Sequence, residues 1–134
     1  MTEPVDKLTI AKHSIDAVLI NNAFHDLYWR PKQESEWPTT DPIAALKNLF
    51  AVVKPGGIVV VADHVDRAGQ DPYVHVDAVH RIDPAVIKRD FAKVGFKFVG
   101  EDKSFANPSD DYTKSAEDAS VLHQTDRVIY KFMK

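Results

Sequence analysis

Two pairs of neighbouring histidine and aspartate residues are the side chains of this sequence best suited to chemistry. His25 and Asp26 follow an apolar run that ends at Ile20, and Asp63 and His64 follow a second apolar run. Imidazole exchanges protons near neutral pH, and a neighbouring carboxylate can orient the ring. We therefore assign His25 as a candidate general base with Asp26 as its partner. The alternative is that His25 only caps its loop through hydrogen bonds.

A second group of polar residues lies between positions 65 and 82, where His80 and Arg81 are candidates for contacting a substrate. Arg81 could instead pair with Asp83. Imidazole and carboxylate groups also suit transition metals, but the spacings match no recognised ligand motif, and scattered surface histidines are the commoner explanation. We therefore assign no metal site. The residues considered for one are His25, Asp63, His64, His75 and His80.

The stretch from position 41 to 64 predicts the elements that position these side chains. Asp41-Pro42 is a good helix opening, because the Asp side chain accepts from free backbone N–H groups and Pro at the first helical position loses no hydrogen bond. Apolar residues then recur at helical spacing. Pro55-Gly56-Gly57 predicts the end of the helix. The β-branched run at 58–62 is typical of a parallel strand that is buried on both faces.

Two further strand patterns and one more helix complete the expected elements. Residues 15–20 predict a second buried strand. A second Asp-Pro opening at Asp83, followed by an apolar stripe and Gly95, predicts a helix. The segments 96–100 and 127–133 predict two strands that pair antiparallel.

The connections between these elements are also informative. The segment 23–40 is rich in aromatic residues and long for a loop, and 65–82 has no clear period, so we expect two functional loops. The aromatic side chains Tyr28, Trp29 and Trp37 could line a substrate pocket or cover the edge of the sheet.

A strand–helix–strand order with parallel strands places the carboxyl ends of 15–20 and 58–62 at the same edge of the sheet, where ligands of open α/β sheets bind. The residues expected to converge there are Asn21, Asn22, His25, Asp26, Asp63 and His64.

The order of four segments resembles the C-terminal half of a class I S-adenosylmethionine-dependent methyltransferase. The segments are DAVLINNAFHDLY, DPIAALKNLFAVVKPGGIVVVADH, HRIDPAVIKRDFAKVGFKFVGE and TDRVIYKF, which together run from about residue 15 to 132. The resemblance implies a partial Rossmann-like α/β fold, with parallel strands, flanking helices and a C-terminal antiparallel strand pair. It also implies that S-adenosylmethionine is the cofactor, that Asn21 and Asn22 border it, and that Tyr28, Asp63, His64, His80 and Arg81 contact the substrate.

The sequence departs from that family at the cofactor site. The glycine-rich loop after the family's first strand and the acidic residue that ends its second strand have no counterpart, since the only Gly-Gly pair is Gly56-Gly57. We therefore expect a truncated domain over 15–134, preceded by a lead-in over 1–14, and weak or no binding of S-adenosylmethionine. We also expect a homo-oligomer or a separate N-terminal half, because the strand at 15–20 should have an unpaired edge.

Composition limits the remaining classes of function. The 134 residues fit one domain, and the net charge of −3 with interspersed charges argues against nucleic acid as a partner. The sequence has no cysteine, no signal segment and no apolar run long enough for a bilayer. A cytoplasmic location is therefore the default expectation, with no membrane partner.

We interpret the chain as a methyltransferase-like domain that acts on an unidentified small-molecule substrate and is impaired or dependent on a partner. Two other interpretations stay open. One is a non-catalytic binding or assembly module that uses its open sheet edge, and the other is a metal-dependent hydrolase.

Overall fold

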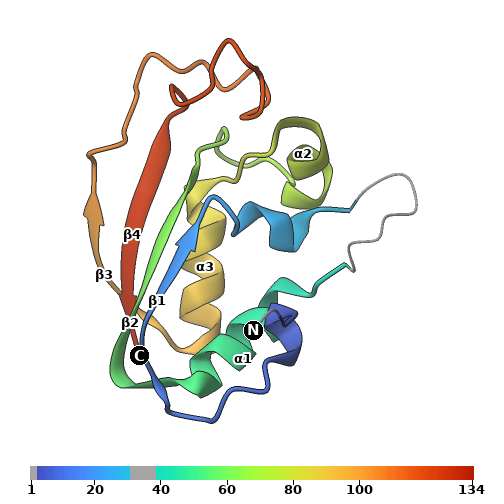
Figure 1. Cartoon of the computed structure of the whole chain (residues 1–134). Coiled ribbons are helices and arrows are strands. Elements are labelled where there is room, and N and C mark those ends of the chain that lie inside the picture. The colour runs from blue at the N-terminus through green and yellow to red at the C-terminus, as the bar shows by residue number, and fades with distance from the viewer. Residues whose placement is uncertain (1–2, 31–38) are drawn as a thin grey trace.

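The computed structural model describes residues 3–30 and 39–134, which form a four-stranded sheet with helices packed against it (Figure 1). The strand order is β1-β2-β4-β3, in which β1 and β2 are parallel and the other two pairs are antiparallel. The elements are η1 (Val5–Lys7), β1 (Ile15–Asn21), η2 (His25–Tyr28), α1 (Pro42–Val52), β2 (Val53–His64), α2 (Pro72–Val79), α3 (Pro84–Val94), β3 (Lys97–Asp102) and β4 (Arg127–Met133). The predicted α/β class and terminal antiparallel pair are confirmed.

All three α-helices begin at an Asp-Pro pair. The side chains of Asp41, Asp71 and Asp83 each accept a hydrogen bond from a backbone N–H in the first turn of α1, α2 and α3, which satisfies donors that would otherwise lack a partner. The helix α2 corrects the expectation of a structureless loop at 65–82. It has only one buried residue, Val76, and therefore lacks the apolar stripe by which a helix is recognised.

The first helix ends earlier than predicted. Val53 is already extended and begins β2, so Pro55-Gly56-Gly57 lies within the strand as an irregularity and does not end the helix. The register changes from Ile15 opposite Val53 to Ala17 opposite Ile58. A Cβ atom at Gly57 would lie 2.7 Å from the Val53 side chain and 2.9 Å from a backbone oxygen, so this position requires glycine.

The expectation that β1 is buried on both faces is wrong for this chain. None of its seven residues is buried, and the side chain of Leu19 is 69% exposed. In Figure 1, α1 and α3 lie on the same side of the sheet. Within the part of the chain that the structure describes, β1 pairs only with β2 and is therefore an edge strand.

The core lies between the sheet and the helices. Val59 and Val61 of β2, together with Phe132 of β4, pack with Ile87 and Phe91 of α3 in one cluster of buried side chains. The rings of Phe91 and Phe132 stack with their centroids 4.0 Å apart. The strands β1 and β2 pair in parallel through their backbones, so their carboxyl ends meet, with Asn21 opposite Ala62.

Among the described residues, no helix combines the length and the hydropathy that a membrane crossing needs.

Candidate active site

A cavity of about 530 Å³ opens at the carboxyl ends of β1 and β2. Its walls come from the segment after β1, from the end of β2, from the residue that follows α2 and from the long connection between β3 and β4. The lining residues are Asn22, Ala23, His25, Asp26, Leu27, Trp29, Thr40, His64, His80, Ala116 and Glu117. Four of the six residues predicted to converge at this edge of the sheet line the cavity, namely Asn22, His25, Asp26 and His64.

His25 is held by Asp63, in addition to its contact with the adjacent Asp26 that the sequence suggested. Nδ1 of His25 lies 2.7 Å from Oδ1 of Asp63, and the backbone N–H of His25 donates to Oδ2 at 2.9 Å. Asp63 is fully buried and does not line the cavity. It therefore orients the imidazole and does not contact a substrate directly. Asp26 lies on the opposite side of the ring, with Oδ1 3.3 Å from Nε2.

The protonation of His25 reflects these contacts. Burial alone lowers the pKa of His25, but the hydrogen bond and the negative charge of Asp63 outweigh burial, so that the pKa is raised above its ordinary value. When the neutral ring donates Nδ1–H to Asp63, its Nε2 carries the lone pair. Nε2 is also the ring nitrogen that lies beside Asp26, a residue of the cavity wall. A neutral His25 can therefore accept a proton there.

Two more imidazoles lie close to His25. The ring of His64 lies 6.0 Å from that of His25 and the ring of His80 lies 5.8 Å from it, centroid to centroid. Burial lowers the pKa of His64 to about 4, so this ring is neutral at physiological pH, and its Nδ1 lies 2.8 Å from the hydroxyl of Thr125. Nε2 of His80 lies 3.6 Å from a carboxylate oxygen of Glu117.

The two asparagines at the end of β1 face different cavities. Asn22 lines the histidine-rich cavity, whereas Asn21 lines an apolar groove of about 520 Å³ along β1, together with Leu19 and Leu46. Asn22 adopts a left-handed backbone with φ 49°. Its side-chain oxygen is buried, and no hydrogen-bond partner for it exists among residues 3–30 and 39–134.

Tyr28 does not line the cavity, although it was a candidate for substrate contact. Its side chain is buried, its hydroxyl donates to a carboxylate oxygen of Asp90, and it accepts from Arg89 at 3.0 Å. Burial raises the pKa of Tyr28. Among the aromatic candidates, Trp29 does line the cavity, and Trp37 lies outside the described residues.

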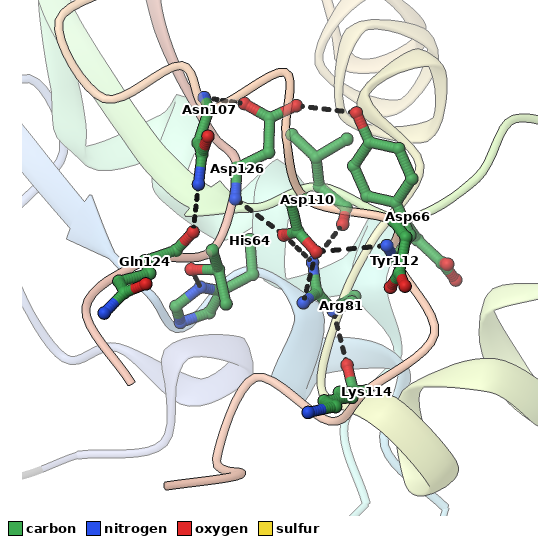
Figure 2. Close-up of polar contacts among 12 residues, drawn as sticks. His64, Asp66, Arg81, Asn107, Asp110, Tyr112, Lys114, Gln124 and Asp126 are labelled. Carbon is green, nitrogen blue, oxygen red and sulfur yellow. Dashed lines mark hydrogen bonds and ion pairs between the residues drawn. The ribbon is translucent and has the colours of Figure 1, made fainter. Parts of the chain in front are cut away.

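Arg81 is also not a substrate contact, and it does not pair with Asp83. Its side chain is fully buried and forms a bidentate pair with Asp110, at 2.7 and 3.2 Å (Figure 2). It also donates to the backbone oxygens of Val65 and Lys114. The side chain of Asp110 is only 3% exposed in this pair, although it belongs to a polar connection between β3 and β4. Arg81 anchors the loop between β3 and β4.

That loop supplies the wall residues which the sequence analysis missed. Ala116 and Glu117 line the cavity, and the backbone N–H of Ala116 donates to the carbonyl of Val79 at 2.8 Å. Figure 2 shows the polar contacts by which Asp110 and Asp126 hold the rest of the loop. The segment is polar and aperiodic, so no local pattern could have placed it over the edge of the sheet.

Comparisons with known proteins identify the fold. Neither family models nor curated proteins match the chain. Many solved structures do match, among them a SAM-dependent methyltransferase from Methanosarcina mazei, with a TM-score of 0.65 at 11% identity, over 98% of this chain and 65% of that one. The chain has the fold of a SAM-dependent methyltransferase. The [4+2]-cyclase SpnF also matches, with a TM-score of 0.64 at 13% identity, over 100% of this chain and 54% of that one.

This chain corresponds to only part of each matching structure, since it spans about half to two thirds of their length. A Haloferax volcanii protein of the methyltransferase type, solved in complex with a methyltransferase activator, matches with a TM-score of 0.60 at 18% identity, over 99% of this chain and 60% of that one. The resemblance predicted from the sequence is therefore confirmed at the level of the fold. A shared fold does not by itself decide the reaction.

Proposed function

We propose that this chain is the acceptor-binding part of a methyltransferase, which transfers the methyl group of S-adenosylmethionine to a small molecule held in the histidine-rich cavity. One observation carries the proposal. In a methyltransferase fold, the buried Asp63 fixes His25 at the carboxyl end of β1, in the wall of a cavity large enough for a small acceptor. Ligands of open α/β sheets bind at this edge.

The residues present fit part of the cofactor. The side-chain oxygen of Asn22 is buried and has no hydrogen-bond partner within the described residues. An N–H or O–H group of a bound ligand would satisfy it. Asn22 would therefore border S-adenosylmethionine in this cavity, and Asn21 would do so from the adjoining apolar groove. S-adenosylmethionine supplies an activated methyl group when it is bound. The remaining contribution of the protein is to align the acceptor with that group.

His25 removes the proton that a hydroxyl or amine acceptor loses. Asp63 accepts the Nδ1–H of His25, so that Nε2 takes the acceptor proton. His80 and the neutral His64 border the acceptor, and Trp29 contributes apolar surface. The cation that forms on His25 is stabilised by the carboxylates of Asp63 and Asp26 on either side of the ring.

A partner supplies the rest of the cofactor site in this proposal. The chain covers only part of each structure that it matches, and one of those structures is a complex with a methyltransferase activator. A separate N-terminal half would complete the sheet beside β1 and supply the glycine-rich loop that this sequence lacks.

Titration with S-adenosylmethionine, followed by NMR of backbone amides, tests the proposal. We expect millimolar binding, with shifts concentrated at the amides of Asn21, Asn22 and His25, and loss of those shifts in Asn22→Ala. Adenosine triphosphate, which lacks the methionine part, is the control. Absence of any shift would contradict methyl transfer, and shifts confined to another face would contradict this site.

A second candidate function is a non-catalytic assembly module, which is favoured by the exposed edge strand β1 and its exposed Leu19. Its backbone groups would pair with a strand of another chain. The two functions differ in ligand binding, because an assembly module would give no response to S-adenosylmethionine either alone or with its partner bound.

A further inference from the structure

Three potential metal ligands converge at the mouth of the cavity. One nitrogen each from His25 and His80 and one carboxylate oxygen from Asp26 all lie within 4.8 Å of one another. His25 and Asp26 belong to η2, whereas His80 ends α2, more than fifty positions further along the chain. Two imidazoles and one carboxylate this close together can reach a common ion through small rotations of their side chains.

The orientation of His25 is that of a metal-binding histidine. Ligating histidines usually donate their other ring N–H to a carboxylate, which fixes the tautomer and makes the free nitrogen more basic. Asp63 plays this part, with 2.7 Å between its Oδ1 and Nδ1 of His25, and it is fully buried. The free Nε2 then lies 3.3 Å from the Asp26 carboxylate.

His80 is positioned by the backbone. It adopts a left-handed conformation with φ 49°, and its N–H donates to the carbonyl of Val76 to end α2. Its Nε2 lies 3.6 Å from a carboxylate oxygen of Glu117. The loop anchored by Arg81 and Asp110 thus brings a second carboxylate to the same place. This carboxylate adds negative charge beside the imidazole and favours a cation there.

We propose that His25, His80 and Asp26 bind a divalent transition-metal ion of the Zn²⁺ type. Two imidazoles and a carboxylate suit such ions, whereas Mg²⁺ and Ca²⁺ prefer sets made of oxygen alone. Because the site faces the cavity, the ion has positions open to an acceptor oxygen or nitrogen, which it would polarise as a Lewis acid. A bound ion would occupy Nε2 of His25, the nitrogen that accepts the proton of the methyl acceptor when no ion is present. Metal binding does not depend on the proposed methyl transfer.

Calorimetry with Zn²⁺ on chelator-treated, desalted protein tests the site without any activity measurement. We expect one ion per chain. The variant His80→Asn removes one ligand but retains the left-handed backbone that Asn tolerates, and we expect at least about a tenfold loss of affinity. Asp26→Asn is a second variant at an exposed position, with the same expectation.

His123→Asn is the matched control, because His123 shares the left-handed backbone of His80, with φ 63°, and lies exposed outside the cluster. Its affinity should equal that of the unmodified chain. Circular dichroism confirms that each variant is folded. No binding by the unmodified chain, or unchanged affinity in both His80→Asn and Asp26→Asn, would overturn the metal site and leave the test of methyl transfer unaffected.

Discussion

Nδ1 of His25 and Oδ1 of Asp63 lie 2.7 Å apart, although the two residues are 38 positions apart in the sequence. The strands β1 and β2 bring them together, because Asn21 pairs with Ala62 directly before the two segments. The same carboxylate also accepts the backbone N–H groups of His25 and His64, at 2.9 and 2.8 Å. One buried aspartate thus fixes the position of the imidazole and of both backbone segments.

The first prediction concerns catalysis by His25. In any preparation with measurable methyl transfer, including one reconstituted with a partner, His25→Ala should lower kcat by roughly a hundredfold or more, because the acceptor loses its general base. His75→Ala is the control, since His75 pairs with Asp66 and does not line the cavity. An unchanged kcat in His25→Ala would show that His25 only caps its loop through hydrogen bonds.

The second prediction concerns the buried pair of Arg81 and Asp110. Arg81→Leu should lower the free energy of unfolding by about 3–5 kcal/mol, because it leaves the Asp110 carboxylate buried without its cation. Lys54→Ala, which removes the exposed pair with Asp16, should cost less than about 1 kcal/mol. Denaturant unfolding followed by circular dichroism measures both. Equal losses in the two variants would show that the Arg81 pair does not anchor the loop.

The third prediction concerns the pH dependence of stability. Burial lowers the pKa of His64 to about 4, from 6.5 in the unfolded chain. Between these two values the unfolded chain binds more protons than the folded chain, so acidification from pH 6.5 to 4 destabilises the fold. Since His64 is only partly buried, we expect a contribution on the order of 1 kcal/mol.

Unfolding measured at several pH values in the unmodified chain and in His64→Gln isolates this effect. The loss of stability between pH 6.5 and 4 should be smaller in the variant. His25 acts in the opposite direction, because its raised pKa gives stability that is full below pH 6.5 and is lost as the pH rises through the folded value. Identical pH profiles in the two proteins would contradict the lowered pKa of His64.

The fourth prediction concerns affinity for the methyl donor. The chain alone should bind S-adenosylmethionine only in the millimolar range, too weakly for calorimetry to resolve, because its sequence lacks a glycine-rich loop and the accompanying ribose-binding carboxylate. A micromolar dissociation constant, equivalent to about 8 kcal/mol, would show that other residues form a complete donor site. S-adenosylhomocysteine, which lacks the methyl group, is the comparison ligand.

The fifth prediction concerns the edge of the sheet. We expect self-association through β1, because its outer edge has no paired strand among the described residues and Leu19 is 69% exposed. Light scattering over a dilution series should show a mass that decreases on dilution, and Leu19→Lys should be monomeric throughout. Leu122→Lys changes another exposed leucine, away from the edge, and should behave as the unmodified chain does.

A monomer at high concentration, with amides 16–20 strongly protected from hydrogen exchange, would mean that the edge is covered from within the chain. That result would contradict both self-association and the assembly function, and it would leave the proposed roles of His25 and Asn22 untouched.

The helix starts at Asp41 and Asp83 and the main strands could be predicted from local patterns in the sequence. Asp41 and Asp83 cap helices through N–H groups that lie two or three residues away, and the alternation at 127–133 matches the buried Val128, Tyr130 and Phe132 of β4. Such signals depend on contacts between neighbours in the chain, so they can be read without knowing the fold. Asp71 carries the same signal, but α2 has too few apolar residues to show a helical stripe.

Contacts between side chains that are distant in the sequence could be identified only from the tertiary structure. The sequence paired His25 with its neighbour Asp26, and packing adds the contact with Asp63 on the other side of the ring. The sequence also placed Arg81 near a substrate, whereas packing buries Arg81 against Asp110, 29 positions away. It also brings Glu117 to His80 from an aperiodic loop. Periodicity and capping report contacts within one or two turns. Pairs across the fold depend on how the sheet, the helices and the anchored loop pack together, and no local pattern contains that information.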